Sequence, residues 1–204
     1  DLFFFSPKHL LLLKHDILTI TSDSAEIILQ HILDIKVNIQ PINPLANSIK
    51  CNFNKKEYIN TVNRLKAEIS AGNIYETNFC IEFFNESVTI NPVEAYEKLS
   101  ENSPTPFSNF FKWFDKYIIG ASPERFLAKR KQNLISQPIK GTSKRSHDVQ
   151  EDQRSKTDLF NNTKERQENV MIVDLVRNDL TKSAKAGTVK VEELFGIYSF
   201  KQVH

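Results

Sequence analysis

The sequence predicts an α+β fold in which antiparallel strands pack with helices. Two observations support this prediction: amphipathic segments long enough to form helices, and apolar strand-like runs that follow one another without a regular strand–helix alternation. The chain has 204 residues, of which 40% are hydrophobic and 25% are charged, so it can bury a sizeable core. No repeat, low-complexity tract or clear boundary divides it. We therefore expect residues 1–204 to form a single domain or part of one.

The N-terminal part, residues 1–50, is predicted to contain strands and one short helix. Residues 9–20 read HLLLLKHDILTI, and a lysine, a histidine and an aspartate interrupt this apolar run. It is therefore predicted as a pair of buried strands, not as a signal sequence or a membrane span. Residues 24–34, SAEIILQHILD, predict the helix. Residues 38–48 are rich in asparagine and proline and predict a surface connection.

Two helices are predicted in the next part of the chain. Residues 55–72 form an amphipathic pattern that Gly72 ends, with apolar residues recurring at three- and four-residue steps at Ile59, Val62, Leu65 and Ile69. Residues 91–102 begin with Asn91 as a predicted N-cap and Pro92 in the first turn. Both segments have local start or stop signals as well as a suitable composition.

A long helix is predicted over residues 163–187, with Thr163 as its N-cap and Gly187 at its end. Its interior, from Val170 to Val176, is apolar nearly all round, so we expect that part to be buried. The preceding residues 148–163 are polar and acidic, which fits a short helix or a loop.

Several apolar runs between and after the helices are predicted as strands. They include residues 74–84, and residues 108–122 with 125–139, which resemble a meander of strands. Phenylalanine is abundant, with fifteen residues, and its clusters are typical of buried strands. The last residues, 196–204, also resemble a strand.

Composition excludes several classes of partner. A net charge of +2 and the absence of a basic stripe interleaved with aromatics argue against nucleic-acid binding. No segment is long and apolar enough to cross a bilayer, so no membrane association is expected. Cys51 and Cys80 have no metal-ligand spacing and suggest no disulfide framework, so a reduced, cytoplasmic setting is the expectation.

The first stretch with unusual chemistry is ASPERF, in which Pro123 fixes the backbone just ahead of Glu124. Glu124 is a candidate general acid or base, provided that its surroundings suit that role. A turn with a local ion pair between Glu124 and Arg125 explains the same pattern equally well.

The second stretch is QPIKGT, where Lys140 is followed by Gly141 and Thr142. Glycine lets the backbone come close to a ligand, and a neutral lysine amine is a nucleophile. The alternative is a lysine in a turn, and on the residues alone this alternative is favoured. The nearby Lys144 and Arg145 are expected on a solvated face.

The third stretch is the long helix, in which Glu168 lies four residues before Ile172 on the face expected to turn inward. A buried carboxylate needs a partner, and Mg²⁺ shared with a substrate anion is one such partner. Asp174 and Arg177 are more simply explained as an ion pair one helical turn apart.

The order and spacing of four motifs resemble those of the chorismate-utilising enzymes, a family that includes the anthranilate, aminodeoxychorismate, isochorismate and salicylate synthases. The resemblance covers about residues 55–204, and residues 1–50 match only the variable beginning of such chains. The motifs are GNIYETNFC, ASPERF, QPIKGTSKR and KERQENVMIVDLVRNDL. The resemblance implies an ADC synthase-like fold, of which residues 1–204 would be one partial chorismate-binding domain whose C-terminal part is absent.

The residues at two positions indicate which branch of the family the chain resembles. Glu76 stands where the water-adding enzymes have lysine and the ammonia-using enzymes usually have glutamine, so isochorismate and salicylate formation are disfavoured. Lys140 stands where the aminodeoxychorismate branch has lysine and the anthranilate branch usually has alanine. The resemblance therefore implies the aminodeoxychorismate branch, which forms 4-amino-4-deoxychorismate for p-aminobenzoate and folate synthesis. The role of Glu76 stays open, and we place it with the substrate-binding residues.

The same resemblance implies roles for five residues. Lys140 would attack chorismate and form a covalent adduct, and Glu124 would protonate the departing hydroxyl. Glu168 would be one ligand of Mg²⁺. Gly141 and Thr142 would line the substrate.

The resemblance also implies a partner and a missing segment. Ammonia would come from a separate glutamine amidotransferase subunit. Related chains continue beyond the point that corresponds to His204, so residues 1–204 alone are expected to be inactive. Two alternatives remain: an anthranilate synthase component I, which would not need Lys140, and a non-catalytic chorismate-binding homologue.

Overall fold

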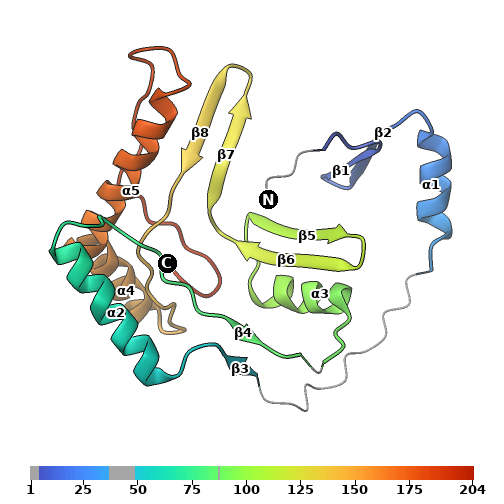
Figure 1. The fold of residues 1–204 in the computed structure, drawn as a ribbon. Coiled ribbons are helices and arrows are strands. Elements are labelled where there is room, and N and C mark those ends of the chain that lie inside the picture. The colour runs from blue at the N-terminus through green and yellow to red at the C-terminus, as the bar shows by residue number, and fades with distance from the viewer. Residues whose placement is uncertain (1–4, 37–48, 87) are drawn as a thin grey trace. The chain divides into compact units, whose positions relative to one another are not determined.

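A computed structural model of the chain describes residues 5–36, 49–86 and 88–204. The chain divides into two compact units, Asp1–Gln40 and Pro41–His204, and each is described here by itself. Helices mix with antiparallel strand pairs, so the predicted α+β class is confirmed (Figure 1). In the described parts of the chain, no helix combines the length and the apolar character that crossing a membrane requires.

The first unit contains a hairpin and a helix, as predicted. Strands β1 (Leu10–Lys14) and β2 (Ile17–Thr21) pair antiparallel, and α1 (Ala25–Asp34) follows. The two turn residues between the strands have positive φ values, which is the conformation that tight hairpins favour. The expected burial of the strand pair is wrong, because Leu13 is 71% and Ile17 is 68% exposed. The predicted connection over residues 38–48 lies outside the described residues.

The second unit contains two helices, α2 and α3, whose starts were predicted correctly. Helix α2 (Lys55–Ser70) has a capping box, in which the side chain of Asn54 accepts the Glu57 N–H and the Glu57 carboxylate accepts the Asn54 N–H. Gly72, just past its end, has φ of 77°. Helix α3 (Pro92–Asn102) is capped by Asn91, as expected, and packs against strand β6.

The strands of the second unit form separate pairs. The strands within residues 50–84 are limited to the short pair β3 (Lys50–Cys51) and β4 (Phe83–Phe84), so most of the strand predicted over residues 74–84 is wrong. Only two residues of β3 offer backbone partners there, which leaves the rest of that segment irregular. The larger hairpins are β5 (Phe107–Trp113) with β6 (Lys116–Ser122), and β7 (Arg125–Arg130) with β8 (Asn133–Gln137). They are two separate two-stranded sheets and not one continuous meander.

The polar stretch after the hairpins is helix α4 (Val149–Asn161), and α5 (Thr163–Thr181) follows at once. The predicted N-cap of α5 was one residue late, because the side chain of Asn162 accepts the Glu165 N–H at 3.2 Å. The helix also ends at Thr181, six residues before Gly187. The strand predicted over residues 196–204 is reduced to one isolated bridge, between Lys144 and Val203.

Apolar packing differs most from expectation. Among the described residues no hydrophobic residue is buried, and His204 is the only buried residue of any type. The interior of α5, expected to be buried, leaves Val170 44% and Leu175 54% exposed. An apolar helix face is buried only where other elements cover it, and the described elements leave this face largely open.

Candidate functional site

Lys140 lies in the loop between β8 and α4, where it meets Glu76 from the segment between α2 and β4. Lys140 Nζ is 2.9 Å from Glu76 Oε1, and the two side chains are 22% and 29% exposed. The structure therefore brings together two predicted site residues that lie far apart in the sequence. Lys140 is thus a half-buried loop lysine with an ion-pair partner from a distant segment.

Glu124 is attached to the same loop. Its Oε1 accepts the backbone N–H of Ile139 at 3.1 Å, and its own N–H donates to Ser122 Oγ at 3.2 Å. Arg125 turns to other partners: Nε donates to Gln137 Oε1 at 2.6 Å, and the guanidinium lies over the Phe107 ring. The carboxylate of Glu124 is thus held beside the residue that precedes Lys140, and the local ion pair considered for Glu124 is replaced by these contacts.

Gly141 brings the loop close to α5. Its φ is 79°, and a Cβ at this position would lie 2.9 Å from Glu165 Oε2 and 3.1 Å from Glu165 Cβ. Glycine meets both requirements, because it adopts positive φ readily and carries no side chain. Thr142, the next predicted residue, is exposed.

Glu168 is half-buried on the second turn of α5, where Lys164 Nζ lies 2.8 Å from its Oε1. The carboxylates of Glu168 and Glu165 raise the pKa of Lys164. Among the described residues no three histidine, cysteine or acidic side chains converge in a way that would hold a metal ion. An oxygen of Glu168 is chemically suited to Mg²⁺, which is commonly held by one or two protein carboxylates together with waters and substrate oxygens, so Glu168 fits as one ligand.

Asp174 and Arg177 form the ion pair that their spacing predicted. Arg177 donates to Asp174 Oδ1 from Nη2 at 2.6 Å and from Nε at 3.1 Å, and both side chains are more than half exposed. This structural interpretation is confirmed.

The sequence did not reveal the cluster formed by Arg145, Asp152, Ser199 and His204, which we name the Asp152 cluster. Arg145 was expected on a solvated face, but its guanidinium donates to both Asp152 oxygens, at 2.8 and 2.9 Å. Its third nitrogen, Nη1, donates to the Phe200 carbonyl at 2.6 Å. Hydrogen bonds from Arg145 and from the Ser146 N–H lower the pKa of Asp152 well below its usual range. No local sequence signal links these residues, because their partners lie up to 55 positions away.

His204 completes the Asp152 cluster. Its side chain is 2% exposed, and its Nε2 lies 3.1 Å from Asp152 Oδ1. Its Nδ1 is 2.8 Å from Ser199 Oγ. Two backbone hydrogen bonds, of 3.1 and 2.9 Å, join Ser143 to His204. The last described residues are therefore attached to the loop that carries Lys140.

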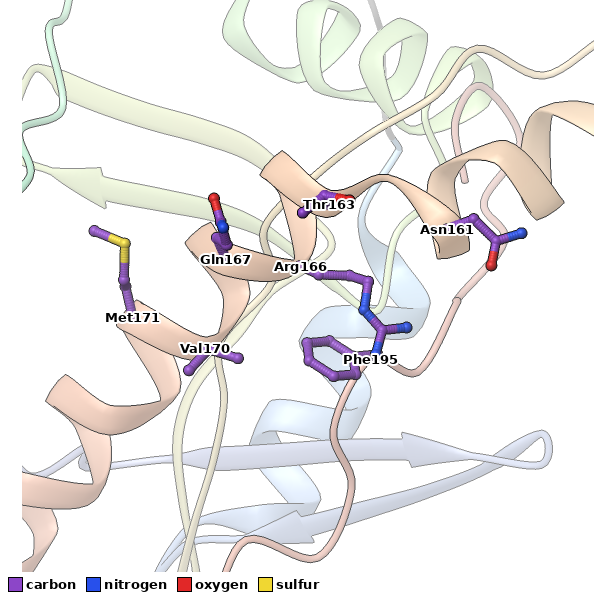
Figure 2. A pocket seen from close by; sticks show the side chains of 7 residues that line it. All are labelled: Asn161, Thr163, Arg166, Gln167, Val170, Met171 and Phe195. Atoms are coloured by element: carbon purple, nitrogen blue, oxygen red, sulfur yellow. The ribbon is translucent and has the colours of Figure 1, made fainter.

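A pocket of about 610 Å³ lies beside the start of α5. Its lining residues are Asn161, Thr163, Arg166, Gln167, Val170, Met171 and Phe195. The guanidinium of Arg166 stacks over the ring of Phe195, 3.9 Å from its centroid (Figure 2). None of the six predicted site residues lines this pocket.

Comparisons with known proteins agree with the motifs. Aminodeoxychorismate synthase component 1 of Salmonella typhimurium is 36% identical over 160 residues, which cover 78% of this chain and 35% of that protein. Anthranilate synthase component 1 of Bacillus subtilis is 34% identical over 160 residues, covering 78% of this chain and 31% of that protein. The chain thus spans about a third of the length of these curated relatives.

A solved structure of similar fold supports the architecture. It is described as a 2,3-dihydroxybenzoate-specific isochorismate synthase of Bacillus anthracis, and it aligns with a TM-score of 0.57 at 21% identity. The alignment covers 71% of this chain and 40% of that one. At this identity the likeness concerns the fold alone. The family described as chorismate binding enzyme matches residues 7–204, and the chain belongs to that family.

Proposed function

We propose that the full-length protein is component I of an aminodeoxychorismate synthase, which converts chorismate and ammonia to 4-amino-4-deoxychorismate. The observation that carries this proposal is the setting of Lys140, a half-buried lysine that contacts Glu76 and directly follows the residue bonded to Glu124. Relatives from the aminodeoxychorismate and anthranilate branches have similar identity to the chain, so overall similarity does not choose between them. The lysine within QPIKGT favours the first branch.

The proposed chemistry uses the amine of Lys140, in the loop between β8 and α4, and the carboxyl group of Glu124, which accepts a hydrogen bond from the same loop. The neutral Lys140 amine attacks C2 of chorismate, forming an N–C bond as the C4–O bond breaks. Hydroxide is a poor leaving group, so Glu124 donates a proton and the hydroxyl departs as water. Ammonia then forms a bond to C4, and the lysine leaves C2 with its electron pair. The ion pair with Glu76 orients the Lys140 side chain before it loses its proton.

Mg²⁺ is proposed as the cofactor, with Glu168 as one of its ligands. The ion would neutralise a carboxylate of the dianionic substrate. Gly141 and Thr142 would line the substrate, through a close backbone approach and a hydroxyl group.

The ammonia is proposed to come from a glutamine amidotransferase subunit. The related proteins from Salmonella typhimurium and Bacillus subtilis are each named as component 1, which supports a partner component for this protein as well. The product would supply p-aminobenzoate and folate synthesis, in a cytoplasmic setting.

The test is product analysis of the full-length protein by liquid chromatography and mass spectrometry. Given chorismate, Mg²⁺ and ammonium at mildly alkaline pH, the protein is expected to form a species with the mass of aminodeoxychorismate. Lys140→Ala should lower the rate at least about 100-fold, because the nucleophile is lost. Lys144→Ala, a change at an exposed lysine four positions along the same loop, should leave the rate within about twofold.

Two outcomes would contradict the proposal. Formation of anthranilate and pyruvate would place the protein in the anthranilate branch, and Lys140 would then be a turn lysine with a structural partner. Mg²⁺-dependent chorismate binding without any turnover would make the protein a non-catalytic homologue.

A further inference from the structure

The loop that carries Lys140 is anchored on both sides of the lysine. Before it, the Ile139 N–H donates to Glu124. After it, Ser143 exchanges two backbone hydrogen bonds with His204, and the Arg145 N–H donates to the Gln202 carbonyl at 3.2 Å. Only two residues lie between Lys140 and Ser143, so a displacement of the second anchor moves the lysine.

The second anchor depends on one carboxylate. Asp152, on the first turn of α4, accepts from the Arg145 guanidinium at two oxygens and from the Ser146 N–H at 2.8 Å. It also contacts His204 Nε2. Three groups of the anchor therefore converge on the Asp152 carboxylate, which is 18% exposed. A bidentate arginine–carboxylate pair fixes direction as well as distance, unlike a contact between two point charges.

Two further hydrogen bonds attach the same loop to α4. Ser143 Oγ donates to the Ser155 carbonyl at 3.3 Å, and Ser155 Oγ donates to the Lys144 carbonyl at 3.0 Å. They fix the distance of the loop from the helix, and they do not involve Asp152. Loss of the Asp152 charge should therefore change the alignment of the loop while the loop stays attached to α4.

We propose that Asp152 is a positioning residue for the reaction at Lys140, acting through Arg145 and His204. The inference rests on the proposed function, because it takes Lys140 as the reacting amine. Asp152 touches neither substrate nor reacting atoms in this account. It holds the residues after Lys140 in register, so that the amine meets C2 of chorismate at the correct distance. Displacements of about 1 Å in a reacting group can reduce a rate on the order of 100-fold.

The experiment measures formation of the covalent adduct in the full-length protein. The protein is mixed with chorismate and Mg²⁺ without ammonium, and intact-protein mass spectrometry follows the gain of one chorismate less one water. Measuring the rate at several chorismate concentrations separates the maximal rate from the concentration that gives half of it. Circular dichroism confirms that each variant is folded at the assay temperature.

Asp152→Asn keeps the size of the side chain and removes its charge. We expect the maximal rate of adduct formation to fall about 10- to 100-fold, with half-saturation by chorismate changed less than about twofold. Arg145→Lys, which keeps the charge but loses the bidentate geometry, should fall between the unsubstituted protein and Arg145→Met. Asp174→Asn removes the same charge from an exposed aspartate–arginine pair and serves as the matched control, with an unchanged rate.

Three results would overturn the inference. The first is an unchanged maximal rate of adduct formation in Asp152→Asn. The second is a fall in that rate no larger than the fall in the fraction of folded protein. The third is a change only in the chorismate concentration that gives half of the maximal rate. Failure of the unsubstituted protein to form an adduct at Lys140 is a different result, because it refutes the proposed function itself and removes the basis of this inference.

Discussion

At the scale of single residues, Gly141 combines a positive φ with a close approach to a neighbouring side chain. Its backbone is in the left-handed region, and the side chain of Glu165 occupies the space that a Cβ would need. Gly72 shares the first property, with φ of 77°, but only open space surrounds the position that a Cβ would take there. Alanine substitutions at the two glycines can therefore be compared: both introduce backbone strain, and only the one at Gly141 also introduces a steric contact.

We expect Gly141→Ala to destabilise the full-length protein more than Gly72→Ala does. Both variants place a Cβ in the left-handed region, which costs about 1–2 kcal/mol. Only Gly141→Ala must also displace Glu165. Unfolding in urea gives the two free energies of unfolding. An equal or smaller loss for Gly141→Ala would show that Glu165 moves aside without cost.

At the scale of elements, the carboxylate of Asp152 joins the start of α4 to the loop before it, and its pKa is lowered. The pKa of Asp152 in the folded protein lies below its value in the unfolded chain, first because Arg145 donates to the carboxylate and then because Ser146 does. A lowered pKa contributes stability above the unfolded-state pKa, about 4 for aspartate, and loses that contribution as the pH falls toward the folded-state value.

The unfolding free energies of the unsubstituted protein and Asp152→Asn should therefore differ by a constant amount above about pH 5 and converge below about pH 4. Urea unfolding of both proteins between pH 6 and pH 3 measures this difference. The many other carboxylates titrate in both proteins, so they cancel in the comparison. A difference that stayed constant down to pH 3 would show that Asp152 does not have the lowered pKa described here.

Elements with local signals were predictable from the sequence. Helix α2 has its apolar periodicity, its capping box and Gly72 within one short segment, and its predicted bounds nearly match the observed ones. The strand predicted over residues 74–84 failed because strand formation depends on a distant partner, and β3 offers only two residues. The predicted burial of Val170 failed for the same kind of reason, since burial depends on which elements cover a helix face.

The residues of the candidate site also divide into those that local sequence signals predicted and those whose contacts depend on other segments of the chain. Lys140, Glu124 and Gly141 stood out because proline, glycine and charge occur there in unusual local combinations, and the structure places them in or against one loop. Arg145 was misassigned to a solvated face because its partners, Asp152 and the Phe200 carbonyl, are separated from it along the chain. Ion pairs between distant segments leave no periodic pattern in a single sequence.

At the scale of the whole chain, the exposure of apolar side chains is the dominant feature. None of the described hydrophobic residues is buried, and large side chains such as Phe126 and Phe83 are 89% and 66% exposed. A soluble domain normally buries a hydrophobic core, and large contiguous apolar patches are rare on the surface of soluble monomers. The 160-residue matches to curated relatives cover only about a third of those proteins, so their sequences contain further residues that can cover such surfaces.

We expect the polypeptide of residues 1–204, purified alone, to bind a hydrophobic dye such as ANS and to show no chorismate turnover. Both expectations follow from its uncovered apolar surface, which gives little packing energy to hold the site in place. The full-length protein, at equal concentration, is the control and should bind less dye per mole. Detectable turnover by residues 1–204 would show that the site forms without further cover.

The hydrogen bond from the Ile139 N–H to Glu124 has a consequence for the geometry of the proposed reaction. Ile139 is covalently joined to Lys140, so one peptide linkage and one hydrogen bond connect the Glu124 carboxylate to the backbone of Lys140. The Lys140 side chain then spans the distance to the amine. This short connection limits how far the Glu124 carboxylate and the Lys140 backbone can separate, and the side chain of Lys140 determines where its amine lies. A ring would be addressed at both positions in a single bound pose where its leaving group lies at the Glu124 carboxyl and its electrophilic carbon lies within reach of the Lys140 amine.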